Sequence, residues 1–228
     1  MPTYLPFVLI GVVAVGLIVW SLVTQRGRMR AQKAASERLG FRPCPDEKAW
    51  LEETVTRIEN NQGFRYEVRD PKRWSEEPPV YTYDKIRYQD ARGDDVVPVA
   101  EQEVLFPLKR ASAGAIVVTV KPSSLAPGLA TRVIGAIAAG PWDAQPDDLY
   151  RLELPPDLKG TNLMRVLGPS GASLYDLVDG DTISVMQGLG DAGGIFVRVR
   201  DGWCSVASAS SQIPFRLDEL LARIRPLL

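Results

Sequence analysis

Histidine is absent from this 228-residue chain, and cysteine occurs only twice, at Cys44 and Cys204. Histidine is the most frequent general base in enzymes and a common metal ligand. Its absence excludes Ser-His-Asp and Cys-His triads as well as a haem or pigment ligated by histidine. Two thiols so far apart in sequence form neither a C-x-x-C redox pair nor a zinc site of their own. We therefore expect a protein that is not an enzyme, with no catalytic residue, metal or cofactor.

An excess of charge of either sign is also missing, since the formal net charge is −1 although 24% of the residues are charged. Nucleic-acid-binding domains carry a basic surface that neutralises phosphates. The balanced charge therefore predicts no nucleic-acid partner. The apolar content is that of a folded protein with a core of its own.

One long stretch has no charged residue, LPFVLIGVVAVGLIVWSLVT from Leu5 to Thr24. Twenty helical residues span about 30 Å, the thickness of the hydrocarbon core of a bilayer. Trp20 lies near one end, where amphipathic rings favour the lipid headgroups. Gly11, Ala14 and Gly16 offer small surfaces for a neighbouring helix. The pattern predicts a single-pass transmembrane anchor in contact with the lipid bilayer.

Basic residues follow this stretch at Arg26, Arg28, Arg30 and Lys33. Lysine and arginine that flank a membrane helix remain on the cytoplasmic side. We therefore expect a bacterial inner (plasma) membrane protein with its N-terminus outside and its C-terminal region in the cytoplasm.

The rest of the chain predicts an α+β fold, in which the anchor is followed by two small mixed α/β lobes with mainly antiparallel strands. The expected segments are an anchor over 1–25, a basic helix or linker over 26–45, a first lobe over 46–140, an extended acidic, proline-rich connection over 141–160, and a second lobe over 161–228.

Three elements have clear sequence signals. DEKAWLEETVTRIEN (46–60) and PFRLDELLARIRPLL (214–228) space their apolar residues as amphipathic helices. IFVRVRDGWCSVAS (195–208) alternates apolar and polar residues on both sides of Asp201 and Gly202. An Asp-Gly pair between two such runs predicts a β-hairpin.

Other segments have weaker patterns. TNLMRVLG (161–168) is interpreted as a short helical piece, and TISVMQ (182–187) as a strand. The alternation in VYTYDKIRYQ (80–89) predicts a strand with a half-exposed face that carries Lys85 and Arg87.

Gly188, Gly190 and Gly193 have the G-x-G-x-x-G spacing of a dinucleotide-binding loop. Such a loop follows a strand and opens a helix, whose N-terminus holds the pyrophosphate. Here the residues after Gly194 are rich in β-branched side chains, which disfavours a helix. We interpret the stretch as a glycine-rich connection between two antiparallel strands.

Proline, tryptophan, tyrosine and acidic residues gather in two irregular segments, around residues 75–81 and 140–160. Loops of this length within compact domains are frequently functional or cover a partner. The expected partner contacts are Pro78, Pro79, Tyr81, Trp142, Asp147 and Tyr150.

These features lead to the hypothesis of a non-catalytic, single-pass membrane accessory or scaffold subunit. It would bind other subunits of a larger membrane complex and stabilise it, for example a bacterial photosynthetic reaction centre with its antenna or another energy-converting complex. The alternative is a membrane-tethered cytoplasmic binding or regulatory module that recruits a soluble protein or a ligand.

Overall fold

The computed structural model describes residues 33–74, 77–89, 99–110, 112, 114–121, 146–193, 196–208 and 216–228. Residues 33–38 form a short helical segment. The chain from Gly40 to Leu228 forms one compact unit.

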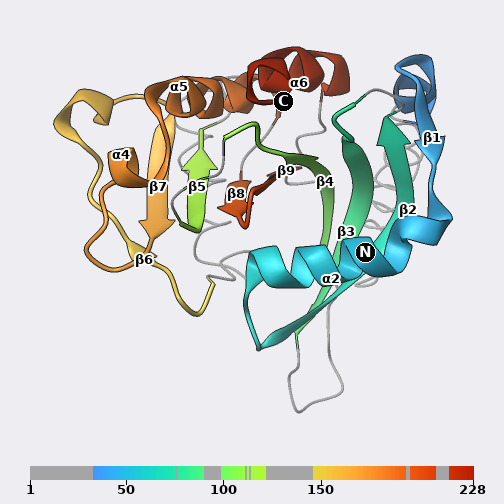
Figure 1. Cartoon of the computed structure of the whole chain (residues 1–228), viewed down its shortest axis with the longest axis horizontal. Helices are drawn as coiled ribbons and strands as arrows, with labels where there is room; N and C mark the ends of the chain where they lie inside the picture. Colours follow the sequence, from blue (N-terminus) through green and yellow to red (C-terminus); the bar gives the residue numbers. More distant parts are fainter. Residues whose placement is uncertain are drawn as a thin grey trace, which may run out of the picture. The chain divides into compact units, whose positions relative to one another are not determined.

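The described residues of this unit form a nine-stranded sheet, in which every neighbouring pair of strands is antiparallel. Its spatial order is β1-β2-β3-β4-β9-β8-β5-β7-β6 (Figure 1). The strands are β1 (Phe41–Pro43), β2 (Phe64–Trp74), β3 (Tyr81–Gln89), β4 (Val99–Pro107), β5 (Ile116–Val120), β6 (Tyr150–Arg151), β7 (Leu163–Gly168), β8 (Phe196–Arg200) and β9 (Trp203–Ser208).

The expected fold of two separate lobes is wrong. The hairpin β8–β9 lies between β4 and β5, so that strands from both expected lobes alternate within one sheet. Pairing between β4 and β9 and between β5 and β8 joins residues that are far apart in sequence. The two halves therefore share one sheet, and the prediction failed because sequence proximity does not reveal such long-range pairing.

Helices lie beside the sheet as α2 (Lys48–Glu59), α4 (Leu174–Leu177), α5 (Gly180–Leu189) and α6 (Leu217–Ile224). Short 3-10 turns are η1 (Pro45–Glu47), η2 (Pro156–Leu158), η3 (Gly190–Ala192) and η4 (Arg225–Leu227). Helix α2 contacts both β2 and β8, so it crosses the strands of one face. Helices α5 and α6 contact each other, and Figure 1 shows them side by side along the top of the view.

Both faces of the central strands are buried. On the face under α2, Leu51, Val55 and Ile58 of the helix pack with Tyr66 and Leu105 of the sheet. On the other face, the alternate strand residues Val104, Phe106, Cys204 and Val206 are completely buried. Alternation of side chains along a strand explains why neighbouring residues serve two different cores.

The expected membrane topology is also wrong. No helix among the described residues is long and apolar enough to cross a bilayer. Helix α2 has 12 residues and a length of about 18 Å, against about 30 Å for a bilayer core. The segment from Leu5 to Thr24, on which the prediction of a single-pass inner-membrane protein with a cytoplasmic C-terminal region relied, lies outside the described residues.

Two secondary-structure predictions are wrong as well. Residues 182–187 belong to helix α5 and not to a strand, because Ile183, Met186 and Leu189 lie at helical spacing and are buried together. Residues 163–168 form strand β7 and not a helix, because they pair with both β5 and β6. The two amphipathic helices and the β8–β9 hairpin are confirmed.

Candidate functional site

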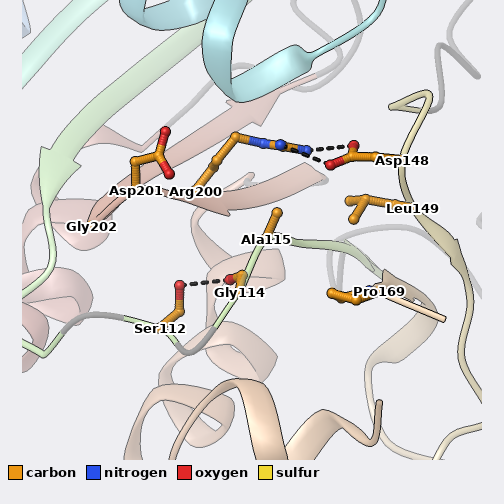
Figure 2. A pocket seen from close by; sticks show the side chains of 9 residues that line it. All are labelled: Ser112, Gly114, Ala115, Asp148, Leu149, Pro169, Arg200, Asp201 and Gly202. Carbon is orange, nitrogen blue, oxygen red and sulfur yellow. Dashed lines mark hydrogen bonds and ion pairs between the residues drawn. The ribbon is translucent and has the colours of Figure 1, made fainter. Parts of the chain in front are cut away.

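A pocket of about 450 Å³ opens where β5 begins and the β8–β9 hairpin turns (Figure 2). The loop before β6 and the residue after β7 complete its wall. The lining residues are Ser112, Gly114, Ala115, Asp148, Leu149, Pro169, Arg200, Asp201 and Gly202.

The top of the pocket in Figure 2 is formed by Arg200, which extends from β8 toward Asp148. The guanidinium donates two hydrogen bonds to the two carboxylate oxygens of Asp148, at 2.7 and 2.9 Å. These hydrogen bonds are the main reason why the pKa of Asp148 lies below its ordinary value. Bidentate pairing of this kind fixes the geometry of both side chains.

Asp201 and Gly202 form the turn at the pocket's other side, with φ angles of 52° and 77°. Positive φ at both central residues is the requirement of a type I′ hairpin turn, and Asp-Gly meets it. Below the ion pair in Figure 2, Ala115, Leu149 and Pro169 contribute apolar surface. The pocket thus combines an apolar floor with two carboxylates and one guanidinium.

A second group of charged side chains is sealed between α2 and the sheet. Lys85 of β3 and Arg198 of β8 lie among three glutamates, and all five side chains are at most 4% exposed. The glutamates are Glu59 of α2 together with Glu101 and Glu103 of β4. We call these five residues the buried charge cluster.

The ammonium of Lys85 contacts all three carboxylates, at 2.9 Å from Glu101 and 3.0 Å from Glu103, and it also pairs with Glu59. Arg198 lies 3.2 Å from Glu59, 3.3 Å from Glu103 and 3.7 Å from Glu101. Ser205 of β9 donates a further hydrogen bond of 2.7 Å to Glu103. The five residues of the cluster therefore link α2 to strands β3, β4 and β8, and Ser205 adds a contact from β9.

Opposite charges favour the ionised forms of Lys85 and Glu101 despite their burial. Burial and Arg198 lower the pKa of Lys85, but the three carboxylates outweigh them and hold it above its ordinary value. Burial raises the pKa of Glu101, whereas Lys85, Arg198 and the buried Arg87 together bring it down to about 2. Three cations thus balance the three glutamates.

The three glutamates also have the arrangement of a metal site, since one oxygen from each lies within 4.8 Å of the others. Carboxylate oxygens are the ligands that Ca²⁺ and Mg²⁺ prefer. Here the ammonium of Lys85 and the guanidinium of Arg198 supply the positive charge that a metal ion would otherwise supply. These residues fit a structural ion cluster better than a metal centre.

The G-x-G-x-x-G glycines lie at the C-terminal end of α5 and in the turn that follows, before β8. A Cβ at Gly190 would collide with the backbone carbonyl of Lys121, and Gly193 has a φ of 89°. The motif therefore connects a helix to a strand, which corrects the expected strand-to-strand connection. The C-terminal end of a helix carries partial negative charge and does not favour a pyrophosphate.

The structure separates the expected partner-contact residues. Tyr150 is 57% exposed on β6 and Asp147 is exposed beside it. Pro78 and Pro79 are half-buried ahead of β3. Tyr81 is 4% exposed, and its hydroxyl donates a hydrogen bond of 2.6 Å to Glu47, so it belongs to the core.

The remaining predicted residues lie at the N-terminus or in the long connection. Lys33 is described, and its carbonyl accepts a hydrogen bond of 2.8 Å from the Ser36 hydroxyl. The others lie outside the described residues, namely Leu5, Gly11, Ala14, Gly16, Trp20, Arg26, Arg28, Arg30 and Trp142.

Sequence reasoning missed the buried charge cluster, because Lys85 and Arg87 were assigned to a half-exposed face. A signal was present in the sequence, since basic residues alternate at Lys85 and Arg87 and acidic residues alternate at Glu101 and Glu103. Alternate charges of opposite sign on successive strands indicate ion pairs across a sheet. The pocket had no comparable signal, because its wall comes from four separate parts of the chain.

No family model, no curated protein and no solved structure matches this chain.

Proposed function

We propose that this chain is a non-catalytic binding subunit that attaches to another protein of a larger assembly through the exposed side chains of Tyr150 and Tyr175. We call these two side chains the tyrosine surface. The exposure of these two side chains is the observation that carries the proposal.

Tyr150 and Tyr175 are the large hydrophobic side chains that stay exposed in the described part of the chain, at 57% and 47%. Tyr150 lies on β6, and Tyr175 lies on α4, the helix that follows β7. The Tyr175 hydroxyl donates a hydrogen bond to Asp157, which keeps the ring in place. Tyrosine is enriched at the centres of protein interfaces, where it supplies apolar area with a polar tip.

The edges of the sheet favour docking by side chains over docking by an added strand. Strand β6 has two residues, and β1 has three and ends in a proline. An edge recognises an extended peptide through a row of free N–H and C=O groups. Edges as short as these two offer few such groups, so the aromatic side chains are the better candidates for recognition.

The buried charge cluster supports the non-catalytic part of the proposal. Strongly perturbed ionisable groups indicate an active site when they line a cleft. Lys85, Glu101 and Glu103 lie beneath α2 and meet Glu59 of that helix, and all four are at most 1% exposed, so a substrate has no access to them. Their arrangement fits a role in holding the helix on the sheet. An energy-converting complex as the larger assembly stays a prediction from the sequence.

Photo-crosslinking in the native host tests this proposal. A benzoylphenylalanine at position 150 is expected to crosslink one partner in a fixed ratio, whereas the same group at Glu53, exposed on α2, is not. The Y150A/Y175A double variant is expected to elute as a smaller particle than the unmodified chain. A wild-type chain that elutes alone, or equal crosslinking from position 53, would contradict the proposal.

A further inference from the structure

We propose that the pocket between Asp148 and Asp201 binds an organic monocation, namely an alkylammonium or alkylguanidinium group. This inference is independent of the tyrosine surface. Leu149, which lines the pocket, is 3% exposed, whereas the neighbouring Tyr150 is 57% exposed, so the two side chains have different surroundings.

The charge of the pocket favours a cation. Its lining contains two carboxylates and one guanidinium, which leaves one excess negative charge. The guanidinium of Arg200 is already committed to Asp148 through two hydrogen bonds of 2.7 and 2.9 Å. An anion would lie near the carboxylates of both Asp148 and Asp201, whereas a monocation neutralises the excess negative charge of the pocket and leaves the pair intact.

Asp201 supplies the uncompensated charge. No cation among the described residues forms an ion pair with it. The hairpin turn does not need this charge, because an Asn-Gly turn adopts the same conformation as an Asp-Gly turn. The carboxylate is therefore available to a ligand, and the Asp201→Asn variant removes the charge while the turn is kept.

Size and polarity define the rest of the ligand. A volume of about 450 Å³ lies in the range of small-molecule sites. Ala115, Leu149 and Pro169 form the floor, which suits a short aliphatic stem. Figure 2 shows these residues below the Arg200–Asp148 pair, so a stem on the floor leaves its cationic end beside the carboxylates. The same chemistry occurs in a free amine or guanidine and in a lysine or arginine side chain of a bound protein.

The test is a titration of the full-length, isotope-labelled chain, followed through the backbone amide resonances of Gly114 and Gly202. The probes are butylamine and propylguanidine as free cations, N-acetyl-lysine methylamide as a side chain within a peptide, and propionate as an anion. We expect saturable shifts of both resonances with at least one cationic probe and none with propionate.

The Asp201→Asn variant is expected to weaken cation binding about threefold, the effect of one exposed charge. Its matched control is Asp218→Asn, an exposed acid on α6, which should leave binding unchanged. An equal melting temperature of the two variants shows that the turn is intact.

Two outcomes would overturn the proposal, namely shifts with propionate alone and equal cation affinity in the Asp201→Asn variant and the wild type. Binding of the free cations alone would identify a small-molecule site, and binding of the lysine derivative alone would identify a site for a basic side chain. The Y150A/Y175A variant should bind the cations normally, so this proposal and the proposed function can fail separately.

Discussion

Lys85 shows how one side chain connects sequence, packing and stability. It is 1% exposed and lies among three carboxylates that come from a helix and a strand. A buried ion pair is weak as a source of stability, but removal of one partner is costly because the other charge stays buried without compensation. The protein should therefore lose less stability when one charge of each sign is removed from the cluster than when a single charge is removed.

Replacement of Lys85 by methionine should destabilise the protein by about 3–5 kcal/mol, since it leaves an excess of buried carboxylate. The K85M/E101L double variant removes one charge of each sign and should recover most of this loss. Urea unfolding of the two single variants and the double variant gives the coupling free energy. Additive losses would show that Lys85 and Glu101 do not compensate each other.

At the scale of the element, helix α5 shows why a local pattern misled the prediction. Residues 182–187 include β-branched residues, which favour a strand in isolation. The structure selects the helix because Asp179 caps it and accepts a hydrogen bond of 2.8 Å from the N–H of Thr182. The apolar residues Ile183, Met186 and Leu189 are then buried on one side.

Replacement of Asp179 by alanine should therefore destabilise the protein by about 1 kcal/mol, the usual contribution of an N-cap. The isosteric Asp179→Asn variant keeps an accepting oxygen and should lose much less. Thermal unfolding of the two variants checks this, with Arg110→Ala as the control for the exposed ion pair that Asp179 forms with Arg110. Equal losses in the alanine and asparagine variants would contradict the role as a cap.

At the scale of the whole molecule, we expect a single cooperative unfolding transition as the pH is lowered, because both halves of the described chain share one sheet. The pKa of Glu101 is about 2 in the folded state, below the 4.5 of an unperturbed glutamate. Its contribution to stability is therefore complete above about pH 4.5 and lost as the pH falls toward 2, at a cost of about 3 kcal/mol.

Far-UV circular dichroism and tryptophan fluorescence should give the same midpoint in an acid titration. The K85M/E101L variant should show a weaker dependence of stability on pH over this window, because it lacks the Glu101 carboxylate. Two separate transitions would indicate that the halves of the sheet unfold independently.

Elements with local signals were predictable from the sequence. The periodic apolar residues of α2 and α6 and the Asp201–Gly202 turn depend on residues that are close together in the chain. The order of the strands was not predictable, because the pairs β4–β9 and β5–β8 bring together distant segments. Segment 161–168 illustrates this, since its residues become a strand only through their two neighbours.

The candidate sites also divide into those with a local sequence signal and those formed by residues far apart in the chain. Tyr150 was identified from the composition of its segment and is exposed. The contact of Arg200 with Asp148 joins residues 52 positions apart, and no local pattern reveals it. Lys85 and Glu101 have a recognisable alternation, but their pairing becomes visible only once β3 and β4 are placed next to each other.

The position of the β8–β9 hairpin has a consequence for synthesis on the ribosome. Among the described residues these strands come last in sequence, yet they fill the centre of the sheet. Until they emerge, the nascent chain has no partner for the inner edges of β4 and β5, and unpaired strand edges promote association between chains. The sheet can therefore close only after residue 208 has emerged, which makes the nascent chain a client for chaperones that shield open strand edges.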